Sequence, residues 1–325
     1  MKTPAMHPLR FVPQYQYRLW GGGKLNTQLH RDCPAESIGE SWEISAVDGF
    51  PSVIEDGPWA GKSLPEMIDA FPEEILGKKC IARYGNTFPL LIKFIDARLP
   101  LSVQVHPNDE LANKRHNCNG KNEMWYILDA DPNAELILGF TENMDPKRYT
   151  KLLTEGRIED VLHREKVTAG DVVNVPAGLI HAIGGGVLLA EIQQSSDVTY
   201  RVYDFNRTDA KTGKKRDLHT NEAIDALDFS AKTTHKIPYK TQDNHPVSLV
   251  SSHFFTTQLI QLTGGNACEN TTLDSFCVLM CVKGNVVLEY AQQAFSIGLG
   301  QCLLLPARLG NYRLQGEGRV LSVTV

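Results

Sequence analysis

The sequence predicts a mainly β protein whose strands form a barrel or jelly roll, with helical pieces inserted between them. Short apolar runs alternate with polar residues, glycine and proline turns separate these runs, and few stretches have helical spacing. The 325 residues, 42% apolar and 22% charged, are of ordinary globular composition. The chain can therefore form one large or two modest domains with an ample core.

The first half of the chain alternates between predicted strands and one predicted helix. Residues 37–55 alternate in polarity and end in turns, which predicts strands. The segment 63–85 predicts a helix, because Ser63 can cap it and Pro65 suits an early helical position. Two apolar, β-rich runs within 88–109 predict a further pair of strands.

The remaining elements are mostly short strands. Residues 123–140 predict a hairpin around an Asp-Pro-Asn turn, and 145–163 predict a second helix. A strand-rich block follows at 166–205, and a lysine-rich polar stretch then leads into a short helix near 220–228. From 246 onward, short strands separated by glycine turns return.

A weak internal repeat indicates two related β units. Residues 170–181 read Gly, five residues, Pro, one residue, Gly, two residues, His, and 300–311 begin with the same Gly and Pro spacing. In the second copy Asn311 stands where His181 stands in the first. We therefore expect a catalytic domain over residues 1–240 and a C-terminal β domain without metal ligands over residues 246–325, which packs against the first.

Charge and hydropathy exclude several classes of protein. A formal net charge of -5 gives no support for a nucleic-acid partner, although a small phosphorylated substrate needs only a local cluster of cations. No apolar run reaches the roughly 18 residues of a membrane-spanning helix, and the first residues lack the apolar core of a signal peptide. A cytoplasmic location is expected.

The cysteines indicate a reduced protein. Their number is odd and their spacing irregular, which is typical of buried free thiols: Cys33, Cys80, Cys118, Cys268, Cys277, Cys281 and Cys302. Cys277 and Cys281 could pair as zinc ligands, but burial within a strand is favoured, because no second Cys/His pair has metal spacing.

Three stretches supply candidate metal ligands. Gln104 and His106 lie two residues apart, so on a strand both side chains leave the same face. Glu123 begins a predicted strand, and His181 follows a Pro-Ala-Gly turn. Such a mixed nitrogen and oxygen set suits zinc, manganese, iron or cobalt, and with water it describes a catalytic site rather than a closed structural one.

The motifs together resemble those of a known family. The string from Gly170 to His181 resembles the second cupin motif. The wider set "WGG", "GESWEIS", "FPLLIKFIDA", "LSVQVHPND", "GKNEMWYI" and "VPAGLIHAIGGGVLLAEIQQSSDVTYRVYDF" resembles the type I mannose-6-phosphate isomerases in their shorter bacterial form. The resemblance covers about residues 10–235 and continues more loosely through the C-terminal repeat. Larger family members have Lys-Pro-Glu where this chain has Lys-Asn-Glu at 121–123.

The resemblance implies a cupin-type jelly-roll barrel with helical insertions, followed by a degenerate cupin-like β domain. It implies interconversion of mannose 6-phosphate and fructose 6-phosphate through a cis-enediol. We expect the protein to be a monomer or a weak homodimer. It also implies one zinc ion per chain, with the following ligands: Gln104, His106, Glu123 and His181.

Candidate residues for the chemistry come from the same stretches. Glu191, Lys121 or a water at the metal could transfer the proton, and the sequence does not decide between them. Arg201 could stabilise the enediolate or anchor the phosphate, and Lys121 and Lys93 are further cations for the substrate. Alternatively, Glu191 and Arg201 could form a structural ion pair, Lys121 could be a solvated loop residue, and Lys93 could extend to water.

Two other classes of protein stay open. The chain could be a cupin that binds a sugar phosphate without catalysis. It could also be a different metal enzyme on the same barrel, such as an iron oxygenase or a cupin-type glucose-6-phosphate isomerase. We expect Trp20, Trp42 and Trp125 to be core residues rather than sugar-stacking platforms.

Overall fold

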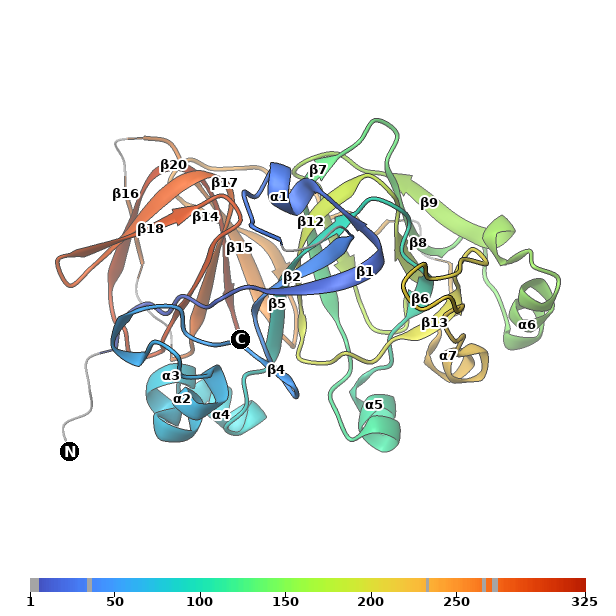
Figure 1. Cartoon of the computed structure of the whole chain (residues 1–325), viewed down its shortest axis with the longest axis horizontal. Helices are drawn as coiled ribbons and strands as arrows, with labels where there is room; N and C mark the ends of the chain where they lie inside the picture. The colour runs from blue at the N-terminus through green and yellow to red at the C-terminus, as the bar shows by residue number, and fades with distance from the viewer. Residues whose placement is uncertain (1–5, 34–36, 232–233, 265–266, 271–273) are drawn as a thin grey trace. The chain divides into compact units, whose positions relative to one another are not determined.

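The computed structural model describes residues 6–33, 37–231, 234–264, 267–270 and 274–325 (Figure 1). The chain forms two compact units, one comprising Met1–Gln14, Trp42–Ile92 and Pro238–Val325, and the other Tyr15–Ser41 and Lys93–Ile237. The domain boundary expected between residues 240 and 246 stays a prediction. No helix in the described ranges is long and apolar enough to cross a membrane.

Two sheets build most of the second unit. The six-stranded sheet has the order β1 (Gln14–Gly22), β2 (Ile38–Ile44), β5 (Leu90–Ala97), β12 (Val187–Gln194), β7 (Glu123–Ala130) and β10 (Val172–Val175). The five-stranded sheet has the order β13 (Tyr200–Tyr203), β6 (Val103–Val105), β11 (His181–Ile183), β8 (Glu135–Phe140) and β9 (Leu162–Lys166). The mainly β prediction is confirmed.

An apolar core joins these two sheets. It combines side chains from β5, β7, β10 and β12 of the first sheet with side chains from β8 and β11 of the second. Because side chains alternate between the two faces of a strand, Trp125 and Ile127 of β7 share a face with Glu123. The same inner face is therefore apolar along most of β7 and acidic at its first residue.

The register of both sheets brings polar residues together. Glu191 of β12 lies opposite Trp125 of β7, and Gln193 lies opposite Glu123. In the second sheet, Gln104 lies between Arg201 of β13 and His181 of β11. Residues that are far apart in the sequence thus become neighbours on adjacent strands.

The helix predicted over 63–85 is divided into three. These are α2 (Leu64–Ala70), α3 (Pro72–Leu76) and α4 (Lys78–Tyr84). Ser63 caps α2 in a reciprocal capping box with Glu66, as expected. The helix breaks because Pro72 begins α3 and Gly77 has φ +80°, a conformation that suits glycine.

The second predicted helix also differs from the structure. Within 145–163, α6 (Pro146–Thr154) is followed by the 3-10 helix η2 (Ile158–Val161), and β9 begins at Leu162. The remaining helices of the second unit are α1 (Lys24–Thr27), α5 (Asp109–His116) and α7 (Thr220–Ala226), and α7 lies where the short helix near 220–228 was predicted.

The hairpin predicted over 123–140 is wrong. The Asp-Pro-Asn turn is present, with Asn133 at φ +66°, but β7 pairs with β10 and β12 whereas β8 pairs with β9 and β11. The turn therefore connects two sheets. The buried apolar residues of β7 and β8 lie in the shared core, so packing one strand over the other is more favourable than pairing them.

The first unit contains a seven-stranded sheet and a two-stranded one. The larger sheet comprises β14 (Pro246–Ser251), β15 (Thr256–Leu262), β20 (Tyr312–Thr324), β17 (Cys277–Tyr290) and β18 (Gln293–Gly298), with β16 (Ala267–Asn270) on β20 and β19 (Cys302–Leu305) on β17. The smaller one pairs β3 (Ala46–Val47) with β4 (Phe50–Pro51), and a 3-10 helix, η1 (Gly57–Trp59), follows.

The two copies of the internal repeat have similar local structure. Gly170 and Gly300 both have positive φ, at +93° and +83°, and each precedes a four-residue strand that ends just before a proline. Asn311, at the position of His181, is exposed.

The buried cysteines of β17, Cys277 and Cys281, are free, which agrees with burial in a strand, and Cys268 has no described side chain. All three core tryptophans are at most 2% exposed.

Candidate active site

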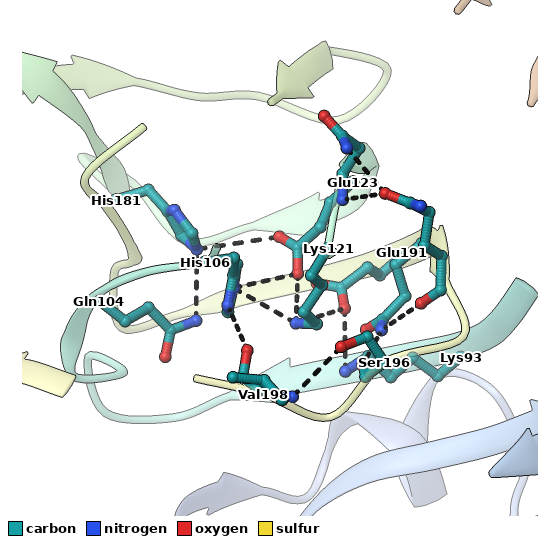
Figure 2. A network of polar contacts seen from close by, with 12 residues as sticks. Lys93, Gln104, His106, Lys121, Glu123, His181, Glu191, Ser196 and Val198 are labelled. Atoms are coloured by element: carbon teal, nitrogen blue, oxygen red, sulfur yellow. Dashed lines mark hydrogen bonds and ion pairs between the residues drawn. The ribbon is translucent and has the colours of Figure 1, made fainter. Parts of the chain in front are cut away.

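Three predicted ligands meet in the interior of the second unit. His106 follows β6, Glu123 begins β7, and His181 begins β11; each is only 1% exposed (Figure 2). His106 Nε2 lies 3.3 Å from Glu123 Oε1, and His181 Nε2 lies 3.8 Å from Glu123 Oε2. In the described part of the chain, this is the one group of three His, Cys, Asp or Glu residues with suitable atoms within 4.8 Å.

Both histidines are held in the tautomer that a metal ligand needs. His106 Nδ1 lies 2.9 Å from the carbonyl oxygen of Val198, and His181 Nδ1 lies 2.9 Å from that of Leu179. A carbonyl accepts only, so each Nδ1 donates its proton and each Nε2 keeps its lone pair. Burial lowers the pKa of His106 to about 4 and also lowers the pKa of His181, which favours neutral rings.

Glu123 is a carboxylate with spare acceptor capacity. Burial raises its pKa, but Lys121 and then His106 outweigh burial and hold the pKa of Glu123 well below its usual range. Lys121 Nζ contacts Oε1, whereas Oε2 is buried without a hydrogen-bond partner among the described residues. An orphaned carboxylate oxygen between two imidazole lone pairs is a donor set that fits a divalent cation.

Gln104 lies beside this cluster. Its Nε2 is 3.3 Å from His181 Nε2, so the amide nitrogen faces the histidine. The amide would have to turn over to direct Oε1 at a metal ion. The structure thus brings Gln104 to the site, but its contact differs from the one that the resemblance implies.

Lys121 and Lys93 are buried rather than solvated. Lys121 Nζ lies 3.3 Å from His106 Nε2 and 4.0 Å from Glu191 Oε1. Lys93 is 6% exposed, and its Nζ lies 2.9 Å from Glu191 Oε1. Burial lowers the pKa of Lys93, but Glu191 and then Glu40 raise it above its usual range, so Lys93 is charged.

Glu191 is held from two sides. Trp125 Nε1 donates to Oε2 at 2.8 Å, and Lys93 Nζ forms an ion pair with Oε1 at 2.9 Å, although Oε1 has no well-directed hydrogen bond from the described residues. Glu191 therefore forms its close ion pair with Lys93 and a longer one with Lys121, and the structural Glu191–Arg201 pair considered from the sequence is not formed. The hydrogen bond to Oε2 and the ion pair at Oε1 together orient the carboxylate at the wall of the site.

Arg201 projects from β13 toward the same space. Its Nη1 donates to the carbonyl oxygen of Asp217 at 2.9 Å, and its Nε is buried without a hydrogen-bond partner in the described residues. Burial, and after it the nearby Arg216, lowers the pKa of Arg201. An unpaired guanidinium N–H of this kind can bind an anionic ligand.

Five of the predicted site residues line a cavity of about 420 Å³, a volume that suits a small polar ligand. Its wall includes Lys93, Gln104, Lys121, Glu191 and Arg201. It also includes charged residues not identified as candidates from the sequence: Arg18, Glu40, Asp197, Asp209 and Arg216.

Two of the overlooked residues had a detectable signal in the sequence. Glu40 stands in β2, whose sequence is IGESWEI and whose seven residues are all buried, and a charge buried there is costly and needs a partner. Arg216 ends the lysine-rich polar stretch that precedes α7. Lys211, Lys214 and Lys215 of this stretch are exposed, but Arg216 turns inward and donates two hydrogen bonds to Asp204.

A polar network fixes the loop that carries Lys121. Asp109 Oδ1 accepts from Gly120 N at 2.8 Å and from Gln194 Nε2 at 3.0 Å. Gln194 Oε1 in turn accepts from the backbone N–H and side-chain amide of Asn122. The loop is therefore tied to β12 and to the start of α5, which positions Lys121 and Glu123.

The fold and the site together define a mainly β protein of the cupin class, with a buried two-histidine, one-carboxylate centre next to a charged pocket. Residues 9–149 match the family model described as phosphomannose isomerase type I, catalytic domain, and residues 246–325 match the mannose-6-phosphate isomerase cupin domain.

Relatives match over nearly the full length. The mannose-6-phosphate isomerase of Streptococcus mutans is 34% identical over 317 residues, or 97% of each chain. Mannose-6-phosphate isomerase ManA of Bacillus subtilis is 34% identical over 95% of this chain and 96% of its own. The crystal structure of mannose 6-phosphate isomerase from Bacillus subtilis has a TM-score of 0.90 at 30% identity, covering 98% of this chain and 100% of that one. The chain belongs to the type I phosphomannose isomerase family.

Proposed function

We propose that this protein interconverts mannose 6-phosphate and fructose 6-phosphate through a cis-enediol. The observation that carries the proposal is the buried cluster of His106, Glu123 and His181 in a chain of this family, which Lys121 links to Glu191 in the wall of a 420 Å³ cavity. The cavity suits a hexose phosphate in size, and it offers both acidic and basic groups.

The proposed cofactor is one zinc ion per chain, held by the two histidines and Glu123. Gln104 completes the set once its amide oxygen turns toward the ion. The donors are nitrogen and oxygen atoms without a thiolate, and both histidines present Nε2, which suits zinc. When bound, such an ion supplies Lewis-acid polarisation of the sugar carbonyl and hydroxyl oxygens.

The residues around this centre have distinct proposed roles. Glu191, which lines the cavity and does not belong to the ligand cluster, removes the proton from C2 of the open-chain aldose and returns it to C1, while the proton of the O2 hydroxyl passes to O1. Lys121, 4.0 Å from Glu191, balances the negative charge that develops on the enediol oxygens. Arg201, with its unpaired Nε, anchors the phosphate, and Lys93 orients Glu191 through their ion pair.

The test is a coupled assay for fructose 6-phosphate formation from mannose 6-phosphate. The protein is assayed as purified, after chelation, and after zinc is restored, with metal content measured in each sample. We expect activity that disappears with the chelator and returns with zinc. His106→Ala should lose both metal and activity, whereas Glu191→Gln should lose activity and retain the metal.

Other outcomes identify the alternatives. A folded, zinc-loaded protein that binds mannose 6-phosphate without turnover is a sugar-phosphate-binding cupin. Activity with glucose 6-phosphate alone, or oxygen consumption with iron, indicates a different enzyme on the same barrel. The expected cytoplasmic location and the expected monomer or weak homodimer stay predictions, and size-exclusion chromatography with light scattering measures the second.

A further inference from the structure

Four charged residues cross the six-stranded sheet in a row, one on each of four neighbouring strands. Arg18 lies on β1, Glu40 on β2, Lys93 on β5 and Glu191 on β12, and these strands are consecutive in the sheet. We call these four residues the charge row. Their signs alternate from the first strand to the last.

Each neighbouring pair in the charge row is in contact. Arg18 binds Glu40 through two hydrogen bonds, at 3.1 and 3.0 Å. Lys93 Nζ lies 3.9 Å from Glu40 Oε2 and 2.9 Å from Glu191 Oε1 (Figure 2 shows the Lys93–Glu191 end). The row therefore links Glu191 to a guanidinium three strands away.

The row becomes more exposed with distance from Glu191. The side chains of Glu191, Lys93 and Glu40 are 3%, 7% and 8% exposed, whereas that of Arg18 is 30% exposed. Buried charges of this kind are costly unless each has an opposite neighbour. Lys93 carries one charge between two carboxylates, so its place depends on both Glu191 and Glu40.

We propose that Glu40 and Arg18 are positioning residues for the isomerase reaction, which hold Lys93 against Glu191 and thereby fix the direction of the Glu191 carboxylate. This inference rests on the proposed function. Without Glu40, the Lys93 Nζ has one carboxylate partner instead of two and moves toward it. The Oε1 atom of Glu191 then changes its angle to the substrate, while Trp125 still holds Oε2.

Kinetics of Glu40→Gln on the full zinc-loaded protein test the role of Glu40. We expect kcat to fall by about tenfold to a hundredfold, because small displacements of a reacting group have effects of this size. KM should stay unchanged within about twofold, because Glu40 is not assigned to bind the substrate. The isotope effect with mannose 6-phosphate deuterated at C2 should increase, because proton transfer becomes more rate-limiting.

A double-mutant cycle tests the link between Glu40 and Lys93. Lys93→Met keeps the length of the side chain and removes its charge. If Glu40 acts through Lys93, the double variant E40Q/K93M should lose no more kcat than K93M alone. The matched control is Glu43→Gln, a buried glutamate on the same strand that does not line the cavity. It should retain wild-type kcat.

Arg18→Met extends the test to the more exposed end of the row and does not require a buried substitution. We expect a kcat loss of about twofold to fivefold with KM unchanged, smaller than that of E40Q because Arg18 acts through one more ion pair. If E40Q does not fold, the cycle is run with Arg18→Met and Lys93→Met instead.

Three results would overturn the inference. One is additive kcat losses in the cycle, and another is an E40Q variant with the kcat and isotope effect of the wild type. The third is an increase in KM alone for R18M, which would mean that Arg18 binds the substrate directly. Loss of the proposed function would appear differently, as a wild-type protein without activity. In that case, the double-mutant cycle of E40Q and K93M is measured on the free energy of unfolding. Coupling between the two substitutions shows that Glu40 holds Lys93, and additive effects refute the proposed contact along the charge row.

Discussion

Replacement of Gly120 by alanine should displace the loop that carries Lys121 and Glu123. A Cβ atom at Gly120 would lie 2.6 Å from both Asn108 C and Asp109 N, and 2.9 Å from Pro107 O. These are backbone atoms, which cannot rotate away as a side chain can. Ordinary contact begins at 3.4 Å, so one of the two segments must move by about 0.8 Å.

The displacement reaches the site because the loop is short. Gly120 N donates to Asp109 Oδ1 at 2.8 Å, and Lys121 N donates to the carbonyl oxygen of Pro107 at 3.1 Å. A shift that separates these partners moves Lys121 directly. It also moves Glu123, which follows Lys121 by two residues. Misplacement of about 1 Å can lower kcat by about a hundredfold, and overpacking costs about 1–3 kcal/mol of stability.

We therefore expect Gly120→Ala to reduce kcat by about tenfold to a hundredfold and to bind less of the proposed metal ion than the wild type. The measurements are steady-state kinetics, metal content by mass spectrometry, and urea unfolding. Gly23→Ala is the matched control, because Gly23 has φ -121° and no atom lies within 4 Å of its added Cβ. A G120A protein with the kcat and zinc content of the wild type would refute the reasoning.

Three further predictions concern stability and reactivity. Ser63→Ala should lower the free energy of unfolding by about 1 kcal/mol without changing kcat, because it removes the cap of α2. Burial raises the pKa of Asp204, but hydrogen bonds from Arg216 and Arg207 outweigh burial and lower it. The stabilisation by Asp204 is thus complete above its unfolded pKa of about 4 and is lost as pH falls through the lower folded pKa. In urea titrations, the difference between the wild type and Asp204→Asn should shrink below about pH 4, and a constant difference would contradict this. Burial raises the pKa of Cys80 to about 12, so peptide mass spectrometry should find Cys80 unlabelled after thiol reagent is added to the folded protein at pH 8.

Local signals in the sequence were sufficient for part of the fold. The Ser63 capping box begins α2 as expected, and the glycine and proline spacing around His181 corresponds to a turn, a short strand and a second turn. These features depend on residues within a few positions of one another, so the local sequence is enough to predict them. The two histidines and Glu123 were likewise marked by their residue types and spacing, and the structure brings them together.

Local sequence patterns were insufficient where a strand has several possible pairing partners that are distant in the sequence. The Asp131 turn looks like a hairpin turn, but the choice between pairing β7 with β8 and packing one over the other depends on β9, β10, β11 and β12. The division of 63–85 is a different case, because Pro72 and Gly77 are local signals in the sequence that the prediction of one continuous helix did not use.

The sequence by itself determined the mainly β class, the residue types at the candidate metal centre and the acidic and basic groups available nearby. Only the tertiary structure decided which charges are partners. Arg18, Glu40, Lys93 and Glu191 come from four separate parts of the chain, and strand order alone makes them neighbours. The reason is physical: the strength of an ion pair depends on distance and burial, and the sheet sets both through pairings between strands that are remote in sequence.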